Sequence, residues 1–130
     1  MILLDTHVVF WLLLAPEQLS SRARDSILQA RSTGERLACS SISLYEIANA
    51  VRRRRLHVKS TIQEFIAAVQ AKLELEPLTA EIAICAADLP QPFHGDPMDR
   101  IIAATAIVGG YTLITHDGRI RKANACKTLW

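Results

Sequence analysis

The chain has 130 residues, half of them apolar, and its 15 basic and 13 acidic residues give a formal net charge of +2. This composition predicts one compact domain over residues 1–130, which can bury a core without disulfides or structural zinc. The small net charge does not by itself indicate a nucleic-acid binder, and such a role would depend on local patches of charge.

The cysteines and the apolar runs bear on the cellular setting. Cys39, Cys85 and Cys126 are far apart and form no CxxC pair, which argues against a disulfide framework or a zinc knuckle. The longest apolar run near the start, residues 8–15, is too short to span a bilayer and follows no basic segment. We therefore expect a cytoplasmic protein without a signal peptide or a membrane anchor.

In the first half of the chain, short apolar runs alternate with segments of helical periodicity. Residues 2–4 form a continuous apolar run, which predicts a buried parallel strand that ends at Asp5. The expected elements, in order, are a strand at 2–4, a helix at 8–14, a helix capped by Ser20 or Ser21 and running to about residue 32 with Ala23, Ile27, Leu28 and Ala30 on its inner face, a strand at 37–40, and a helix opened by Ser43 with Glu46 in a capping box.

In the second half, Asp96-Pro97 is the strongest helix start, because aspartate caps the first turn and proline suits the first helical position. Two prolines and a glycine make residues 89–96 the clearest loop. The remaining expected elements are a helix capped by Thr61 with Glu64 three residues on, a weak strand at 75–78, a helix at 80–88 capped by Thr79, a helix from 97 to about 108, a strand at 111–115, a short helix after Asp117 and a last strand at 126–130.

Strands that alternate with helices predict an α/β fold with a parallel sheet covered on both faces. In such folds ligands bind beyond the carboxyl ends of the strands. Asp5 and Asp117 follow strands, and two further acids, Glu46 and Asp99, lie in the first turns of helices that begin at the same edge. Four close carboxylates repel one another unless a cation is present, and oxygen ligands select Mg²⁺ or Mn²⁺. Such an ion would activate a water molecule and stabilise charge on a phosphodiester.

Each acid also has a structural interpretation. Glu46 and Asp99 could cap helices and favour the positive end of the helix dipole. Asp117 could be an ordinary turn residue before Gly118. Asp5 stands apart, because a carboxylate directly after a buried strand has no evident capping role. The metal-site hypothesis therefore depends on the four acids converging.

Four segments of the chain resemble PIN-domain proteins of the VapC toxin type. They occur in the family's order, and the resemblance runs from the first residue to the end of the chain. The most specific of them reads H-x-D-P-x-D-R-I-I-A-A. The segments are residues 1–7 (MILLDTH), 43–47 (SLYEI), 94–106 (HGDPMDRIIAATA) and 113–117 (LITHD).

The resemblance implies a PIN-like three-layer α/β/α sandwich with a short, mostly parallel central sheet. It implies a metal-dependent endoribonuclease with Mg²⁺ or Mn²⁺ as cofactor, which cleaves RNA as the toxin of a toxin–antitoxin pair. The implied partners are a cognate antitoxin protein that blocks the site and a second copy of the chain in a homodimer. The implied site comprises the catalytic residues Asp5, Glu46, Asp99 and Asp117, the metal ligands Asp5, Asp99 and Asp117, and the supporting hydroxyl residues Thr6 and Thr115.

The basic run at residues 52–55 has two interpretations. It could bind RNA phosphates, or it could form a solvated helix end, where cations favour the negative pole of the dipole. Arg53 lies two helical turns after Glu46 on roughly the same face, so that Arg53, with Arg52 beside it, is the expected RNA-binding residue. Trp11 and Phe10, in an apolar helix, are expected to contact the core or a dimer partner rather than a base.

Three histidines lie beside the candidate acids, and imidazole can ligate transition metals. Their spacing matches no standard motif such as HExxH. We therefore expect a hydrogen bond to the backbone for His94 and supporting or surface positions for His7 and His116.

Other functions also use acids at the ends of parallel strands. A receiver-like signalling module, which binds Mg²⁺ without catalysis, needs adjacent acids after the first strand and a lysine after the last. This chain offers Asp5 alone and has Asp117 in place of the lysine. A DxD phosphatase is disfavoured because His7 stands two residues after Asp5. A DNA-directed nuclease with the same acids stays open, since metal chemistry on a phosphodiester does not choose the sugar.

Overall fold

The computed structural model describes residues 1–90, 93 and 95–130. Of the loop expected over residues 89–96, residues 91, 92 and 94 lie outside this part, and so does the expectation for His94. The elements, in chain order, are β1 (Ile2–Leu4), α1 (Thr6–Leu14), the 3₁₀ turn η1 (Pro16–Gln18), α2 (Ser21–Thr33), β2 (Leu37–Ser40), α3 (Ser41–Arg52), α4 (Ile62–Lys72), β3 (Glu74–Glu76), α5 (Ala80–Asp88), α6 (Pro97–Gly109), β4 (Thr112–Ile114), α7 (Gly118–Ala123) and β5 (Thr128–Leu129).

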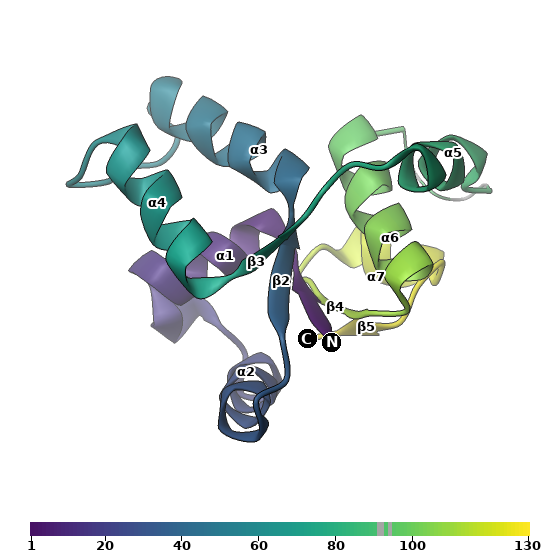
Figure 1. Cartoon of the computed structure of the whole chain (residues 1–130), viewed down its shortest axis with the longest axis horizontal. Helices are drawn as coiled ribbons and strands as arrows, with labels where there is room; N and C mark the ends of the chain where they lie inside the picture. The colour runs from purple at the N-terminus through teal and green to yellow at the C-terminus, as the bar shows by residue number, and fades with distance from the viewer. Residues whose placement is uncertain (91–92, 94) are drawn as a thin grey trace.

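The strands form a five-stranded parallel sheet in the order β3-β2-β1-β4-β5 (Figure 1). β1 is central, with Leu4 paired to Cys39 of β2 on one side and to Ile114 of β4 on the other. The residues that follow these three, namely Asp5, Ser40 and Thr115, therefore lie side by side at one edge of the sheet. This edge is where the carboxyl ends of the three central strands meet.

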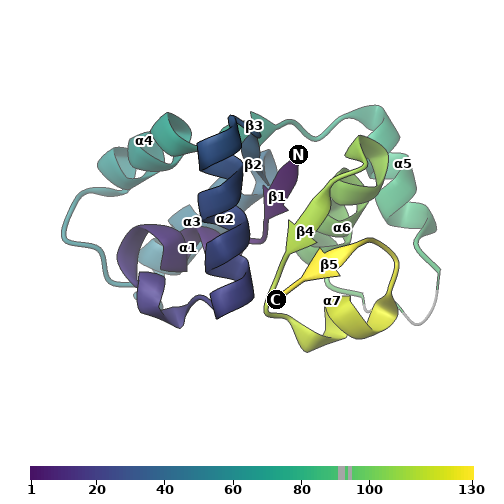
Figure 2. The ribbon, with the colours of Figure 1, turned by 90° about the horizontal axis from the view of Figure 1, so that it is seen from below.

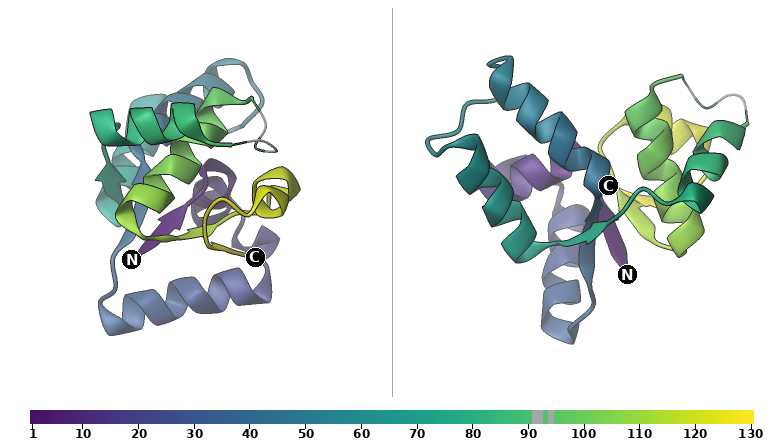
Figure 3. Two further views of the ribbon diagram at one scale, coloured as in Figure 1. Left: turned by 90° about the vertical axis from the view of Figure 1, so that its right-hand side faces the viewer. Right: turned by 45° about the horizontal axis from the view of Figure 1, so that its top comes forward.

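Alternating side chains of the strands divide the core between the two faces of the sheet. Ile2 and Leu4 pack with helices α1 to α4, whereas Leu3 packs with α6 and α7. Helix α5 packs on α6 through Ala86 and Ala104. The two helical layers are seen from below in Figure 2 and from two further sides in Figure 3. The expected three-layer α/β/α sandwich is confirmed, and its short sheet is parallel throughout.

Four helix starts agree with their predicted caps. In each of them a side-chain oxygen accepts a hydrogen bond from a backbone N–H of the first turn. The capping residues are Ser20 of α2, Thr61 of α4, Thr79 of α5 and Asp96 of α6. Helix α2 ends, as predicted, at Gly34, which adopts the left-handed φ of +74° that glycine permits.

The start of helix α3 differs from its prediction. The helix begins at Ser41, and Ser40, the last residue of β2, caps it by accepting from the N–H of Ile42 at 3.3 Å. Ser43 is a buried third residue of the helix, and Glu46 is its sixth. The predicted capping box of Ser43 and Glu46 is therefore wrong, because the strand leads into the helix without a loop.

Two smaller expectations are also corrected. Helix α1 begins at Thr6, two residues earlier than predicted, again because the chain passes directly from a strand into a helix. Leu28 is 55% exposed instead of lying on the inner face of α2. It follows the buried Ile27 by one residue and therefore points about 100° away around the helix. In the described part of the chain, no helix combines the length and the apolar composition that crossing a membrane requires.

Candidate active site

Four acidic side chains from four elements gather where the central strands end. Asp5 directly follows β1, and Asp117 follows β4 as the N-cap residue of α7. Glu46 lies in the second turn of α3, and Asp99 is the third residue of α6. Asp117 acts electrostatically on Asp5, and both Asp5 and Asp99 act on Glu46. The structure thus brings the four sequence-predicted acids to one edge of the sheet.

Buried Thr115 connects Asp5 with Asp117. Its hydroxyl donates to Oδ2 of Asp5 at 2.6 Å, and its Oγ1 accepts from the backbone N–H of Asp117 at 3.0 Å. Oδ1 of Asp5 accepts from the backbone N–H of Thr6 at 2.8 Å. Because both oxygens of Asp5 accept hydrogen bonds, the orientation of this carboxylate is fixed.

Thr6 connects the start of α1 with α3. Its hydroxyl donates to Oε1 of Glu46 at 2.6 Å and lies 2.9 Å from Oγ of Ser43. Both hydroxyl residues are buried, whereas Glu46 is partly buried. Thr6 and Thr115, the two predicted supporting residues, therefore each hold one acid: Thr115 holds Asp5, and Thr6 holds Glu46.

Arg119 contacts the other two acids. One guanidinium nitrogen lies 3.1 Å from Oδ2 of Asp117 and 3.5 Å from Oδ2 of Asp99. Oδ1 of Asp117 accepts from the backbone N–H groups of Arg119 and Ile120, at 2.7 and 3.4 Å. Burial favours the neutral form of Asp117, but the hydrogen bonds from Arg119 and the backbone outweigh it and lower the pKa of this carboxyl group.

The protonation of Asp5 and Glu46 shifts in the opposite direction. Burial raises the pKa of Asp5, against the hydrogen bonds from Thr115 and Thr6. Burial likewise raises the pKa of Glu46, and the charges of Asp5 and Asp99 add to the rise, whereas the hydrogen bond from Thr6 opposes it. These directions are those expected of carboxylates crowded together in a poorly solvated place.

Two of the acids have structural duties as well. Asp5 caps α1, which corrects the expectation that it has no capping role, and Asp117 caps α7 instead of standing in an ordinary turn. Conversely, Asp96 rather than Asp99 caps α6, and Glu46 lies beyond the first turn of α3. The capping interpretation therefore fails for Glu46 and Asp99, although Asp99 does lie in the first turn of α6, near the positive end of the helix dipole.

The donors at this edge are carboxylate oxygens, which suit a hard divalent cation such as Mg²⁺ or Mn²⁺. Among the residues that the structure describes, no three His, Cys, Asp or Glu side chains already stand in position to enclose an ion. Instead, the guanidinium of Arg119 contacts Asp99 and Asp117. The chemistry of the donors fits a metal ion, provided that Asp99 and Asp117 turn from Arg119 toward it.

The histidines beside the acids belong to an aromatic cluster. The ring centroids of His7 and His116 lie 6.1 and 5.5 Å from that of Trp11. His116 also lies 5.1 Å from Trp130. Both imidazoles are exposed. Their placement provides aromatic surface next to the acids.

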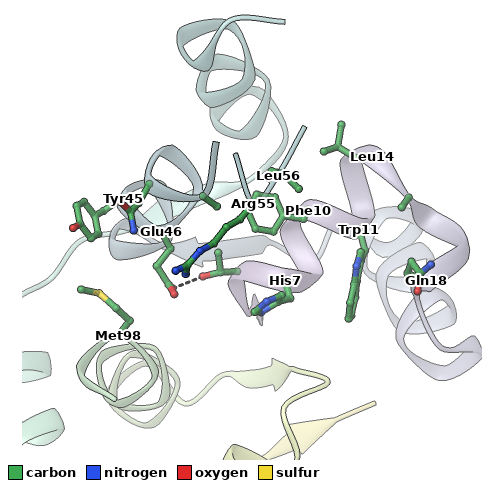
Figure 4. Close-up of a pocket in the computed structure, with 14 residues that line it drawn as sticks. His7, Phe10, Trp11, Leu14, Gln18, Tyr45, Glu46, Arg55, Leu56 and Met98 are labelled. Carbon is green, nitrogen blue, oxygen red and sulfur yellow. Dashed lines mark hydrogen bonds between the residues drawn. The ribbon is translucent and has the colours of Figure 1, made fainter. Parts of the chain in front are cut away.

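A groove of about 630 Å³ adjoins the acids between α1 and α3 (Figure 4). Thr6 and Glu46 line it and also belong to the hydrogen-bonded network of the acids. Arg55 lines it as well, and its guanidinium extends toward Glu46 in Figure 4. Arg52 and Arg53, the predicted RNA-binding residues, are exposed at the end of α3 and are not part of the groove wall.

Sequence reasoning misses Arg119, gives Ser43 only a capping role, and includes Arg55 only as part of the basic run at residues 52–55. Each depends on a contact that local sequence does not display. Ser43 meets Thr6 from 37 residues away, and Arg119 reaches Asp99 because α6 and α7 begin at the same edge.

Comparisons with known proteins agree with this fold. The family model described as PIN domain matches residues 2–125. Ribonuclease VapC22 from Mycobacterium tuberculosis is 34% identical over 120 residues, which cover 92% of this chain and 89% of that protein. The chain therefore belongs to the PIN-domain family, as the four motif segments predict.

Solved structures show the same fold. In the crystal structure of VapBC2 from Rickettsia felis bound to a DNA fragment from their promoter, one chain matches with a TM-score of 0.76 at 18% identity, covering 99% of this chain and 98% of that chain. A toxin–antitoxin complex from Klebsiella pneumoniae matches with a TM-score of 0.68 at 19% identity, covering 100% and 97%. At these identities the likeness concerns the fold.

Proposed function

We propose that the chain is a divalent-metal-dependent endoribonuclease, with residues 1–130 acting as a single PIN domain. The observation that carries the proposal is the convergence of four acids from four elements at one edge of the sheet. The ribonuclease name of the relative from Mycobacterium tuberculosis supports RNA as the substrate. A non-catalytic magnesium-binding module is not favoured, and the DNA-directed alternative is separated by the experiment below.

In this proposal Asp5, Asp99 and Asp117 are the ligands of Mg²⁺ or Mn²⁺, and Glu46 completes the catalytic set. When bound, the ion would activate a water molecule and stabilise negative charge on the phosphodiester. Asp99 and Asp117 must exchange the cation of Arg119 for the metal.

The two threonines act as positioning residues. The Thr115 hydroxyl holds Oδ2 of Asp5, and the Thr6 hydroxyl holds Oε1 of Glu46. A neutral hydroxyl orients a carboxylate and leaves its negative charge available for a metal ion. Such supporting hydrogen bonds are needed because crowded carboxylates would otherwise turn away from one another.

We further propose that the protein is the toxin of a toxin–antitoxin pair in the cytoplasm. It would bind a cognate antitoxin and form a homodimer. The structural match to a toxin–antitoxin complex supports the antitoxin partner. The absence of close cysteine pairs supports the cytoplasm, since Cys39, Cys85 and Cys126 are all free. Arg53 and Arg52 remain proposed RNA contacts, because both are exposed beside the groove.

The test is cleavage mapping on total cellular RNA with the purified protein, in Mn²⁺ and in EDTA, with single-stranded DNA in parallel. We expect cleavage of RNA in Mn²⁺ only and intact DNA. The matched control for Asp99→Asn is Asp25→Asn, which alters an exposed aspartate of α2. Cleavage in EDTA, or undiminished cleavage by folded Asp99→Asn, would contradict the metal site. Equal cleavage of DNA would contradict RNA as the substrate class.

A further inference from the structure

The end of helix α3 turns the chain back toward the groove. The N–H of Arg54 donates to the carbonyl oxygen of Val51 at 3.1 Å, and the N–H of Arg55 donates to that of Ala50 at 2.9 Å. This pair of hydrogen bonds is a Schellman motif, whose left-handed residue is commonly glycine. Here that residue is Arg54, with a φ of +57°. Arg54 therefore adopts a backbone conformation that side chains disfavour, and this turn brings the next residue, Arg55, back to the helix.

The turn places two neighbouring arginines differently. Both are exposed, but Arg53, the C-cap residue of α3, lies outside the groove. Arg55 follows the turn and returns to the side of α3 that carries Glu46 and Asn49, where it lines the groove. A positive charge thus lies in the same groove as one of the candidate catalytic acids (Figure 4).

The α1 side of the groove is aromatic, with Phe10 and Trp11 in its wall. Trp11 is held by His116 and Trp130, whose ring centroids each lie 5.5 Å from its own. Trp11 packs against the core, as expected from the sequence, but its indole is only partly buried. An aromatic ring that neighbours hold in place and that still borders a groove suits stacking with a nucleobase.

We propose that a single-stranded segment of the RNA next to the scissile phosphate lies in this groove, with a phosphate bound by Arg55 and a base against Trp11. This assignment rests on the proposed ribonuclease function. Thr6 and Glu46 belong both to the groove and to the acid network, so that a strand in the groove leads to the acids. The volume of about 630 Å³ lies within the range of roughly 300–1,000 Å³ that is usual for ligand pockets.

Charge and shape favour RNA over a peptide as the occupant. A guanidinium binds a phosphate through several parallel N–H donors, and stacking on an aromatic ring accepts any base. The ring lies on α1 and the cation lies in the turn after α3, on the other side of the groove, which suits a strand with a backbone side and a base side. Arg53 and Arg52, the other proposed RNA contacts, do not line the groove.

The experiment measures binding of a fluorescently labelled single-stranded oligoribonucleotide in EDTA, over a range of salt concentrations. Arg55→Ala should weaken binding about tenfold, as expected for the loss of one charge-assisted contact. It should also reduce the slope of log affinity against log salt by roughly 0.7, the value for one phosphate of a single strand. Arg31→Ala, which removes an exposed arginine from the last turn of α2, is the matched control and should change the affinity about twofold or less.

Two further variants separate the side chain from the turn. Arg54→Gly keeps the left-handed turn without its strain, and it should retain wild-type affinity for RNA. Trp11→Leu keeps an apolar side chain in the cluster but removes the stacking surface. It should weaken binding about fivefold or more, with an unchanged salt slope.

Cleavage with Mn²⁺ is measured in parallel on the same proteins. Arg55→Ala should raise KM with little change in kcat, because Arg55 is proposed to bind a phosphate other than the scissile one. If the wild type does not cleave RNA, the proposed function fails. If the wild type cleaves RNA but Arg55→Ala and Arg31→Ala bind it equally well, only the groove assignment is overturned.

Discussion

The two sides of the acid cluster differ in how their negative charge is held. On one side, Asp5 is 4% exposed and, like Glu46, accepts a hydrogen bond from a threonine hydroxyl. On the other side, the side chains of Asp99 and Asp117 are 14% and 24% exposed and share the guanidinium of Arg119. A hydroxyl orients a carboxylate and leaves its charge in place, whereas a guanidinium neutralises the charge. The first side, Asp5 and Glu46, is therefore fixed in advance and is the arranged side. The second side, Asp99 and Asp117, can exchange one cation for another and is the exchangeable side.

The largest expected effect is loss of catalysis when either side loses a carboxylate. Asp5→Asn and Asp99→Asn should each lower the rate of RNA cleavage by more than about 100-fold. Mutating a residue that only supports a metal ligand already lowers activity by roughly 10–100-fold, and losing the ligand itself should cost more. Single-turnover rates in Mn²⁺ measure this effect, with Asp25→Asn as the control of equal charge. A folded Asp5→Asn protein that cleaves at the wild-type rate would remove the arranged side from the catalytic site.

A smaller loss should follow when a threonine of the arranged side is replaced without loss of charge. Thr115→Val keeps the shape of the side chain but removes the donor to Oδ2 of Asp5. We expect a loss of activity of roughly 10–100-fold, with the fold retained. Thr105→Val is the control, since Thr105 is buried on α6 and its hydroxyl donates to a carbonyl of its own helix, that of Ile101. Equal activity of the two valine variants would contradict a positioning role for Thr115.

The two sides should respond oppositely to pH in the absence of metal. The raised pKa of Asp5 means that its ionised form destabilises the fold above its unfolded pKa, and that this penalty is absent in acid. The lowered pKa of Asp117 means that its ionised form stabilises the fold above its unfolded pKa, and that this gain is lost as the pH falls through the folded pKa. In EDTA at pH 7, Asp5→Asn should therefore melt at or above the wild type, and Asp117→Asn below it.

Thermal melts in EDTA between pH 3 and 8 measure both differences. Each should shrink as the pH falls below about 4, near the unfolded pKa of aspartate. Changes in melting temperature of the same sign for Asp5→Asn and Asp117→Asn at pH 7 would contradict the opposite pKa shifts of the two carboxyl groups.

The smallest expected effect concerns the cation that the exchangeable side already holds. Arg119→Ala removes a competitor for the oxygens of Asp99 and Asp117, and the protein should then bind Mn²⁺ about two- to fivefold more tightly, a range set by the weakness of exposed ion pairs. Titration calorimetry measures the affinity, and Arg121→Ala on the same helix is the control. A weaker Mn²⁺ affinity in Arg119→Ala than in Arg121→Ala would contradict the competition.

The sequence predicts elements whose signals are local. The helix expected at residues 80–88 is found there, because Thr79 caps its first turn and apolar residues recur at helical spacing. The strand before Asp5 and the helix after Asp96 are also where the sequence places them. The four acids could be proposed for the same reason, since each stands beside a strand end or a helix start.

The links among the acids could not be predicted, because they join residues distant in the sequence. The spacing of Ser43 and Glu46 is that of a capping box, yet both side chains are hydrogen-bonded to Thr6 at the start of α1. Thr115 reaches Asp5 across 110 positions of sequence. Arg55 enters the groove because Arg54 adopts a left-handed conformation for which the sequence has no glycine. Local patterns therefore identify these residues as candidates but do not predict their contacts.

The most direct test of the central claim, that both sides form one metal site, is the rise in melting temperature on addition of Mn²⁺ after EDTA treatment. A ligand that binds only the folded state raises the melting temperature by mass action. We predict a clear rise for the wild type and for Asp25→Asn, and a strongly reduced rise for both Asp5→Asn and Asp117→Asn. A wild-type melting temperature indifferent to Mn²⁺, or an equal rise in all four proteins, would contradict a shared metal site.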